Sequence, residues 1–219
     1  LLKDPSRPTT FKKRYIVDNQ KLFRVSRLED HSLNSELENK IISKVEELAP
    51  NSNSIVISDF VYGVITKKIL KKITLIAKKY NLLLFGDVQC SSQIGLITKF
   101  KDFSLLCPNE REARLALQDK ESGLEIIGQK LLSETSSKYL IMKLGSEGFI
   151  TYDRSNTGSL YSFSFPALSV NPVDVAGAGD SLLSVMATGL SSNQSLMKTS
   201  AIACCVAALA VEQMGNTPI

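Results

Sequence analysis

The sequence predicts an α/β fold in which helices cover both faces of a mainly parallel sheet. Apolar runs that end in a carboxylate, at 55–59 and 82–87, have the pattern of buried parallel strands. Segments with helical spacing alternate with such runs, as they do in βαβ units. Sheets of this kind bind ligands beyond the carboxyl ends of their strands, so we expect a polar site along that rim.

The elements are expected in the following order. Residues 9–25 hold two short β-rich runs around a polar break, which is typical of a hairpin. Apolar residues recur at helical spacing in the segments 37–48, 65–80, 110–117, 124–133, 178–189 and 195–213. Short apolar runs bounded by turn residues predict strands at 55–59, 82–87, 103–107, 139–143, 149–152 and 160–165.

Composition indicates a packed globular chain, with 43% hydrophobic and 22% charged residues. The net charge is +4, but the lysines between positions 67 and 79 fit the solvated face of one helix and lack stacking aromatics, so no nucleic-acid partner is predicted. The apolar run 201–211 is too short to cross a bilayer, which predicts no membrane partner. Four cysteines without CxxC spacing and a single histidine argue against a zinc site and favour reduced thiols in the cytoplasm.

The stretch from Asn171 to Leu183 organises the candidate site. Gly177, Ala178 and Gly179 let the backbone approach a ligand, and the helix that follows begins with N–H groups that attract an anion, most often a phosphate. Asp180 would repel that phosphate unless it accepted the proton of an attacking hydroxyl. We therefore predict a phosphoryl-transfer site. A helix N-cap with glycine-rich punctuation explains the local residues equally well.

Other polar residues fit the same chemistry, each with a structural alternative. Asn109 and Glu112 share the first turn of a helix and suit Mg²⁺ bound through waters, although a capping box explains them better in isolation; the two are compatible. The loop 143–148 either contacts phosphate or base through its glycines or forms a simple hairpin turn. Asp59 and Asp87 are sugar or metal-water contacts or helix caps, and Asp174 either binds a cation or starts a turn.

The order of these pieces resembles the ribokinase-like (PfkB) carbohydrate kinase family. The residues that carry the resemblance are Asp174-Val-Ala-Gly-Ala-Gly-Asp180, preceded by Asn109-x-x-Glu112 and Lys143-x-Gly-x-x-Gly148, and the match extends over nearly the whole chain. Within the family the chain looks closest to the heptose-7-phosphate kinase domain of bacterial ADP-heptose synthesis. That closer likeness rests on Pro8-Thr-Thr-x-Lys12-x-Arg14, Asn19-Gln20-x-Leu22-x-Arg24, Ser58-Asp59-Phe60-x-x-Gly63 and Gly215-Asn-Thr-Pro-Ile219.

The resemblance implies a three-layer ribokinase-like fold with a small β lid at 1–30 and a nucleotide-binding kinase core at 31–219. It implies ATP-dependent phosphorylation of a sugar or sugar-phosphate hydroxyl, with Asp180 as general base and the backbone of Gly177, Ala178 and Gly179 as the anion hole. Mg²⁺ is implied at Asn109 and Glu112, a monovalent cation at Asp174, and ATP beside Lys143, Gly145, Gly148 and Cys204. The implied acceptor contacts are Lys12, Arg14, Asn19, Asp59 and Asp87, and the lid is expected to form a homodimer.

The chain departs from the family pattern in several places. Tyr62 and Gln89 stand where the heptose-kinase pattern has lysine, Cys204 replaces an asparagine and Val175 a threonine. The chain opens on Leu1 without Met, and the family's N-terminal strands and Gly-Gly sugar motif would precede it. We therefore expect an incomplete sugar site, a piece of a longer protein, and a fragment that is inactive alone. The alternatives are a catalytically silent nucleotide-binding or interaction module, or a kinase of the same family acting on a nucleoside or another small alcohol.

Overall fold

The computed structural model describes residues 1–17, 20–90, 93–154, 160–169 and 172–212. The strands are β1 (Phe11–Val17), β2 (Gln20–Arg27), β3 (Ser54–Asp59), β4 (Leu83–Val88), β5 (Leu105–Leu106), β6 (Tyr139–Lys143), β7 (Phe149–Arg154) and β8 (Leu160–Phe165). The helices are α1 (Ser35–Leu48), α2 (Lys67–Tyr80), α3 (Glu110–Leu117), α4 (Leu124–Thr135), α5 (Ala178–Ser191) and α6 (Leu196–Ala210). Short 3₁₀ turns lie at Ala49–Asn51, Ile97–Lys99 and Gly145–Glu147.

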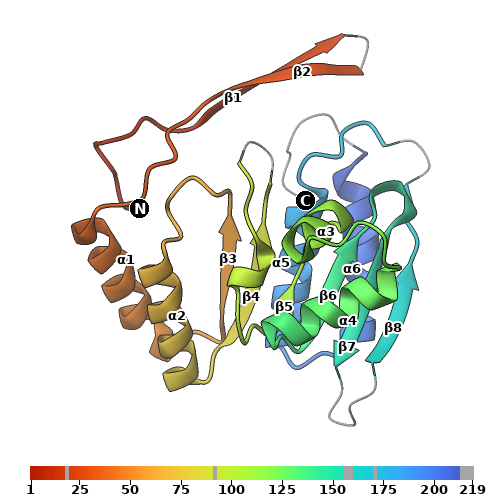
Figure 1. Ribbon diagram of the computed structural model, residues 1–219. Coiled ribbons are helices and arrows are strands. Elements are labelled where there is room, and N and C mark those ends of the chain that lie inside the picture. The colour runs from red at the N-terminus through yellow and green to blue at the C-terminus, as the bar shows by residue number, and fades with distance from the viewer. Residues whose placement is uncertain (18–19, 91–92, 155–159, 170–171, 213–219) are drawn as a thin grey trace.

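The main sheet has six strands in the order β3-β4-β5-β6-β7-β8. The first four are parallel; β7 pairs antiparallel with β6, and β8 pairs antiparallel with β7. Successive side chains of a strand point to opposite faces, so Leu84 and Leu140 pack in one core, and Phe85 and Ile141 in the other. Helices α2, α3 and α4 cover the first face and α5 and α6 the second (Figure 1). The predicted three-layer α/β fold is confirmed.

Local sequence explains where the helices begin and end. The Asn34 side chain accepts the Leu37 N–H at the start of α1, and Thr66 accepts the Ile69 N–H at the start of α2. Helix α2 ends at Asn81, which adopts the left-handed conformation that asparagine tolerates well. The six lysines of α2 are exposed, as predicted. No helix in the described ranges combines the length and hydropathy of a membrane span.

Two predicted elements are shorter than expected. The strand predicted at 103–107 has a ladder only at Leu105–Leu106, because Asp102 turns the chain with φ +61° and Pro108 has no N–H to donate. The helix predicted at 195–213 ends at Ala210, and the carbonyl of Val211 turns instead toward the loop before α5, where it accepts the backbone N–H groups of residues 173 and 174. Position 213 lies outside the described residues.

The strands β1 and β2 form an antiparallel hairpin that projects from the main body, as Figure 1 shows. Arg7 fixes its base. The guanidinium donates to the carbonyl oxygens of Tyr62 at 2.6 Å and His31 at 2.5 Å, and to the Asp4 carboxylate at 2.7 Å. Gly63 makes this approach possible, because it adopts φ +76° and a Cβ there would overlap the His31 carbonyl. The two chain segments entering and leaving the hairpin are thus bound to one loop.

Candidate active site

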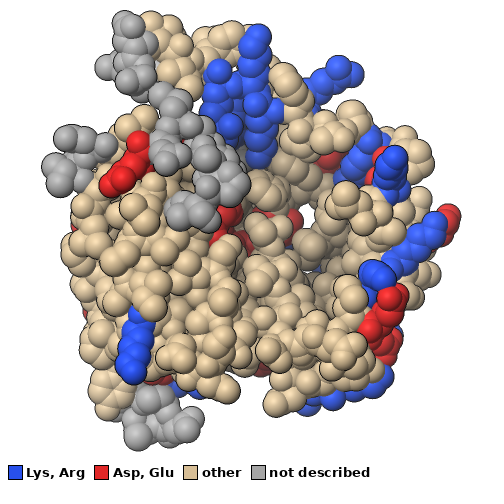
Figure 2. Space-filling view, turned by 180° about the vertical axis from the view of Figure 1, so that it is seen from behind, with Lys and Arg blue, Asp and Glu red and all other residues tan. Residues whose placement is uncertain are grey.

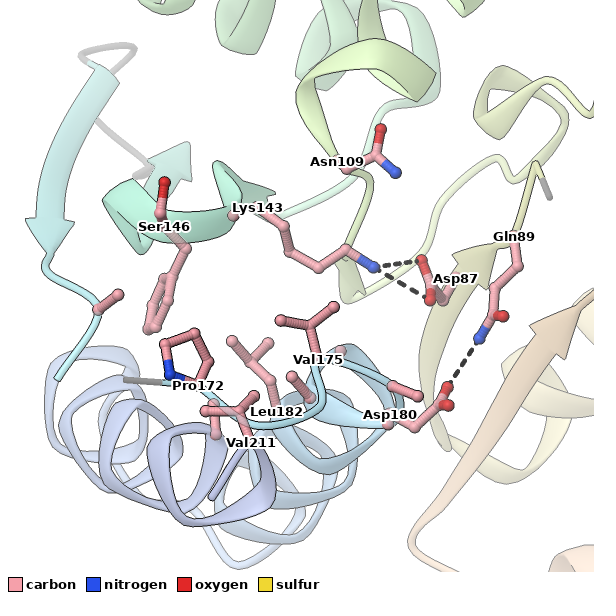
Figure 3. Close-up of a pocket in the computed structure, with 18 of the residues that line it drawn as sticks. Asp87, Gln89, Asn109, Lys143, Ser146, Pro172, Val175, Asp180, Leu182 and Val211 are labelled. Atoms are coloured by element: carbon pink, nitrogen blue, oxygen red, sulfur yellow. Dashed lines mark hydrogen bonds and ion pairs between the residues drawn. The ribbon is translucent and has the colours of Figure 1, made fainter. Parts of the chain in front are cut away.

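A cavity of about 1240 Å³ opens beyond the carboxyl ends of β4 and β6, at the predicted rim. Its walls come from the hairpin, the start of α3, the 143–148 turn, the segment before α5 and one face of α6. Figure 2 shows lysine and arginine side chains on the hairpin above a hollow in which acidic side chains are visible. In Figure 3, the polar groups of Asp87, Gln89 and Asp180 lie at one end and the apolar side chains of Pro172, Val175, Leu182 and Val211 at the other.

The N-terminus of α5 forms one wall of the cavity. Gly177 is its N-cap and has φ +88°, a conformation that favours glycine. Its carbonyl accepts the Ser181 N–H at 2.9 Å, so the helix begins directly behind it. The N–H groups of Ala178 and Gly179 therefore lie in the first turn, where no intrahelical acceptor exists, and all three residues line the cavity. This geometry suits an anion.

Asp180 lies in the first turn of α5 and is half-buried. Its Oδ1 accepts a hydrogen bond of 2.8 Å from the Gln89 side-chain amide. Burial raises the pKa of Asp180, and the nearby Asp87 carboxylate raises it further, whereas Lys143, the Gln89 hydrogen bond and Lys12 act in the opposite direction. A carboxylate with a raised pKa is a stronger base than an exposed one.

Lys143 ends β6 and points toward β4. Its ammonium lies 3.0 Å and 3.1 Å from the two carboxylate oxygens of Asp87, which is almost fully buried. A Cβ on Gly179 would lie 3.4 Å from the same ammonium, so the cation stands beside the start of α5. Burial works to lower the pKa of Lys143, but the carboxylates of Asp87 and Glu112 and the hydrogen bond with Asp87 outweigh it, and the pKa is raised. Lys143 is therefore a fixed cation next to the anion-binding backbone.

Asn109 and Glu112 form a complete capping box at the start of α3. The Asn109 side chain accepts the Glu112 N–H, and Glu112 Oε2 accepts the Asn109 N–H, both at 2.8 Å. The other carboxylate oxygen of Glu112 accepts the Cys90 N–H at 3.2 Å, and burial raises the pKa of the group. Among the described residues, no three His, Cys, Asp or Glu side chains converge closely enough to hold a metal ion. The donors fit Mg²⁺ bound through waters, because the Glu112 oxygens keep further lone pairs.

The 143–148 loop is the hairpin turn between β6 and β7, and it also lines the cavity through Lys143, Gly145 and Gly148. The Leu144 N–H donates to the Gly148 carbonyl at 2.8 Å, closing the turn. Gly148 has φ +92°, and a Cβ there would overlap the Phe165 carbonyl. Across the cavity, the Cys204 thiol of α6 donates to the Pro166 carbonyl at 3.0 Å. The loop and α6 face the apolar end.

Most predicted site residues line this cavity, including Lys12 and Arg14 of the hairpin. Asp59 does not: it is buried, its carboxylate pairs with Lys99 and accepts the Val61 N–H. Asp174 is also buried outside the cavity wall, where its Oδ1 accepts the Ala176 N–H at 2.8 Å and shapes the loop before α5. Asn19 lies outside the described residues.

Sequence reasoning missed the role of Gln89, which it recorded only as a departure from a family pattern. The contact with Asp180 joins positions 91 residues apart, so no local sequence pattern predicts it. The aromatic residues Phe60 and Tyr62 also line the cavity. The Lys12 ammonium lies 4.5 Å from the ring centre of Phe60 and 5.2 Å from that of Tyr62, which places it over both rings.

Comparisons with known proteins identify the family of the chain. The family model described as "pfkB family carbohydrate kinase" matches residues 6–218. The chain belongs to this family. Among curated relatives, the bifunctional protein HldE of Campylobacter jejuni subsp. doylei is 29% identical over 97% of the chain, and that of Geobacter metallireducens 26% identical over all of it. The chain covers 44% of the length of each of these relatives.

Solved structures of PfkB-type kinases share the fold. Phosphofructokinase-2 from Escherichia coli, in complex with potassium, superposes with a TM-score of 0.70 at 18% identity, covering 89% of this chain and 62% of that one. Ribokinase of Arabidopsis thaliana, complexed with ribose and ATP, gives a TM-score of 0.70 at 19% identity, with coverage of 95% and 65%. These similarities establish the ribokinase-like α/β fold of the PfkB chain.

Proposed function

We propose that this PfkB chain transfers the γ-phosphoryl group of ATP to a hydroxyl of a sugar or sugar phosphate. The observation that carries the proposal is the position of Asp180, half-buried in the first turn of α5 beside backbone N–H groups that suit an anion. Asp180 accepts the hydroxyl proton as the oxygen attacks phosphorus. The bond to the bridging β,γ-oxygen breaks, ADP leaves, and the helix start stabilises the charge on the transferred group.

The cavity offers a distinct place for each end of the nucleotide. The apolar end, between the 143–148 turn and α6, suits a purine ring, with Cys204, Ala207 and Val211 among the lining residues. The phosphates would then extend toward Lys143 and the start of α5. Mg²⁺ would supply positive charge that neutralises the phosphates. Asn109 and Glu112 would hold its waters, and the buried Asp174 would serve a monovalent cation.

The acceptor side favours a phosphorylated sugar, such as a heptose 7-phosphate. Lys12, Arg14 and Arg24 of the hairpin line the same cavity as Asp180 and bring positive charge to it. The Lys12 charge lowers the pKa of Asp180, which supports an acceptor phosphate close to the candidate base. Phe60 and Tyr62 provide apolar surface against a sugar ring. This matches the sequence resemblance to heptose-7-phosphate kinases.

Calorimetry and turnover assays test the proposal. Titration of the protein with ATP·Mg²⁺ should show binding. ADP release should then appear with sugar phosphates and be weaker with the corresponding free sugars. Lys12→Met should raise KM for the phosphorylated acceptor about 10-fold and leave KM for a free sugar nearly unchanged. Lys101→Met, which removes a surface ion pair with Glu134 outside the cavity, is the control.

A catalytically silent nucleotide-binding module is the second candidate. It is favoured by the amide of Gln89, which occupies one oxygen of the proposed base where the heptose-kinase pattern has lysine. The same assays separate the two, because a silent module binds ATP·Mg²⁺ and releases no ADP with any acceptor.

We also propose that the hairpin forms a homodimer contact. Large apolar side chains remain exposed on both of its strands, among them Phe11, Val17, Leu22 and Val25, each more than half exposed. Two such ribbons pairing would bury apolar surface that a single chain leaves in water. Light scattering should give twice the chain mass, and Leu22→Glu with Val25→Glu should restore the monomer mass. An unchanged mass in this variant would exclude the hairpin as the contact.

A further inference from the structure

We propose that Gln89 is a positioning residue, which orients the Asp180 carboxylate through a neutral hydrogen bond and leaves its second oxygen for the acceptor hydroxyl. The inference rests on the proposed function, since it assigns Asp180 as the base. It concerns a residue that departs from the lysine of the heptose-kinase pattern. Figure 3 shows Gln89 directed from the end of β4 toward Asp180.

The segment that carries Gln89 is held on both sides. Its own N–H donates to the Asp59 carbonyl at 2.8 Å, and the N–H of the next residue, Cys90, donates to Glu112 at 3.2 Å. Asp87 lies two positions earlier, so the two side chains leave the chain on the same face. The Asp87 carboxylate is held by the Lys143 ammonium. The amide of Gln89 therefore reaches Asp180 from a backbone with little freedom to move. A donor mounted this way restricts the carboxylate more than a flexible surface side chain would.

A neutral donor does something that a cation at this position would not. Both an amide and an ammonium can hold Asp180 Oδ1, but a positive charge also stabilises the ionised carboxylate and makes it a weaker base. The charged groups that face Asp180 are Asp87, Lys143 and Lys12. Burial and the Asp87 charge outweigh the two lysines, so the pKa of Asp180 is raised. Gln89 supplies orientation and adds no further charge to this balance. Its hydrogen bond lowers the pKa of Asp180, but burial and Asp87 still prevail and the pKa stays raised.

Two substitutions separate orientation from charge. Gln89→Met keeps the approximate length of the side chain and removes the donor, while Gln89→Lys keeps a donor and adds the charge. The carboxyl ¹³C resonance of Asp180, assigned with Asp180→Asn in protein labelled at the aspartate carboxyl carbon, reports the titration directly. We expect the apparent pKa of Asp180 to rise in Gln89→Met and fall in Gln89→Lys. The acidic limb of the kcat/KM profile should move in the same directions.

Turnover supplies the second measurement. Gln89→Met should lower kcat about 10-fold to 100-fold with little change in the KM for ATP, because the base is misoriented and the nucleotide contacts remain. The chain offers a matched control in Gln93, whose side-chain amide donates to Asp30 at 2.7 Å outside the cavity. Gln93→Met removes a hydrogen bond of the same type and should change neither the Asp180 titration nor kcat.

The outcomes distinguish this proposal from the function it rests on. Phosphoryl transfer with identical Asp180 titration in the wild type, Gln89→Met and Gln89→Lys would overturn the role of Gln89 alone. A wild-type protein that transfers no phosphoryl group to any acceptor would overturn the proposed function, and with it the catalytic purpose of the contact. If Gln89→Met loses activity because it misfolds, it will also lose ATP·Mg²⁺ binding. The role of Gln89 is then tested by whether the pKa of Asp180 falls in Gln89→Lys.

Discussion

The Lys143 ammonium is shared between the two carboxylate oxygens of Asp87, at 3.0 Å and 3.1 Å, beside the first turn of α5. The contact joins the ends of β6 and β4 and sets opposite charges next to each other at the centre of the cavity. Both charges also act on Asp180, since Asp87 raises its pKa and Lys143 lowers it. The same ion pair therefore holds the ends of β4 and β6 together and influences the pKa of the candidate base.

Breaking this pair from one side should destabilise the fold. Asp87 exposes 1% of its side chain and Lys143 19%, so either residue left alone is a poorly solvated charge. We expect Lys143→Met to lower the free energy of unfolding by about 3 kcal/mol, and the double variant Lys143→Met with Asp87→Leu to lower it by less. Urea denaturation measures both. A double variant less stable than either single one would contradict this account.

The pH dependence of activity should reflect the same pair. A base must be deprotonated to act, so a raised pKa of Asp180 places the acidic limb of kcat/KM above the ordinary aspartate value of 3.8. Asp87→Asn removes a negative charge and should move that limb to lower pH. Lys143→Met removes a positive charge and should move it to higher pH. If both variants shift the limb in one direction, Asp180 is not the group that titrates.

Replacing the base should separate binding from chemistry. Asp180→Asn keeps the shape of the side chain but cannot accept the hydroxyl proton, and we expect kcat to fall by about 10²-fold to 10⁴-fold. The affinity for ATP·Mg²⁺ should be unchanged or slightly greater, because a negative charge near the phosphates is removed. Steady-state assays and calorimetry report the two effects. Turnover equal to the wild type would refute the assignment of Asp180.

The turn between β6 and β7 requires a glycine. A Cβ on Gly148 would overlap the Phe165 carbonyl, and the backbone has φ +92°, so Gly148→Ala should destabilise the fold by about 2–4 kcal/mol. Gly123 is the matched control, because no atom lies within 4 Å of its added Cβ and its φ is −64°. Gly123→Ala should cost no more than about 1 kcal/mol. Thermal unfolding compares the two variants.

Local patterns account for most of the fold. The predicted limits of β6, α3 and β8 coincide with those in the structure, because their apolar runs end at turn or capping residues that act over a few positions. Strand β5 came out shorter than predicted because its length depends on the turn at Asp102 and on pairing with two neighbours, which the run itself does not encode.

The candidate site was partly predictable for the same reason. The Gly177–Asp180 motif and the Asn109–Glu112 box are local, and the structure places both on the cavity wall. The partners of Asp59 and Asp180 are not local: Lys99 is 40 residues from the first and Gln89 is 91 from the second. Such contacts depend on which strand ends and turns meet in three dimensions. A sequence pattern can therefore predict which carboxylates belong to the site, but not which donor each carboxylate contacts.

The contacts of Arg7 hold the base of the hairpin, so the hairpin can rotate about this point. The seven residues of β1 span about 23 Å at about 3.3 Å per residue, and Arg7, just before them, is bound to the loop around Tyr62. A rotation of about 5° at that pivot would sweep the far end through about 2 Å and leave Lys12, near the pivot, almost in place. Such a rotation would thus move Val17, at the far end of β1, much more than the cation above the cavity.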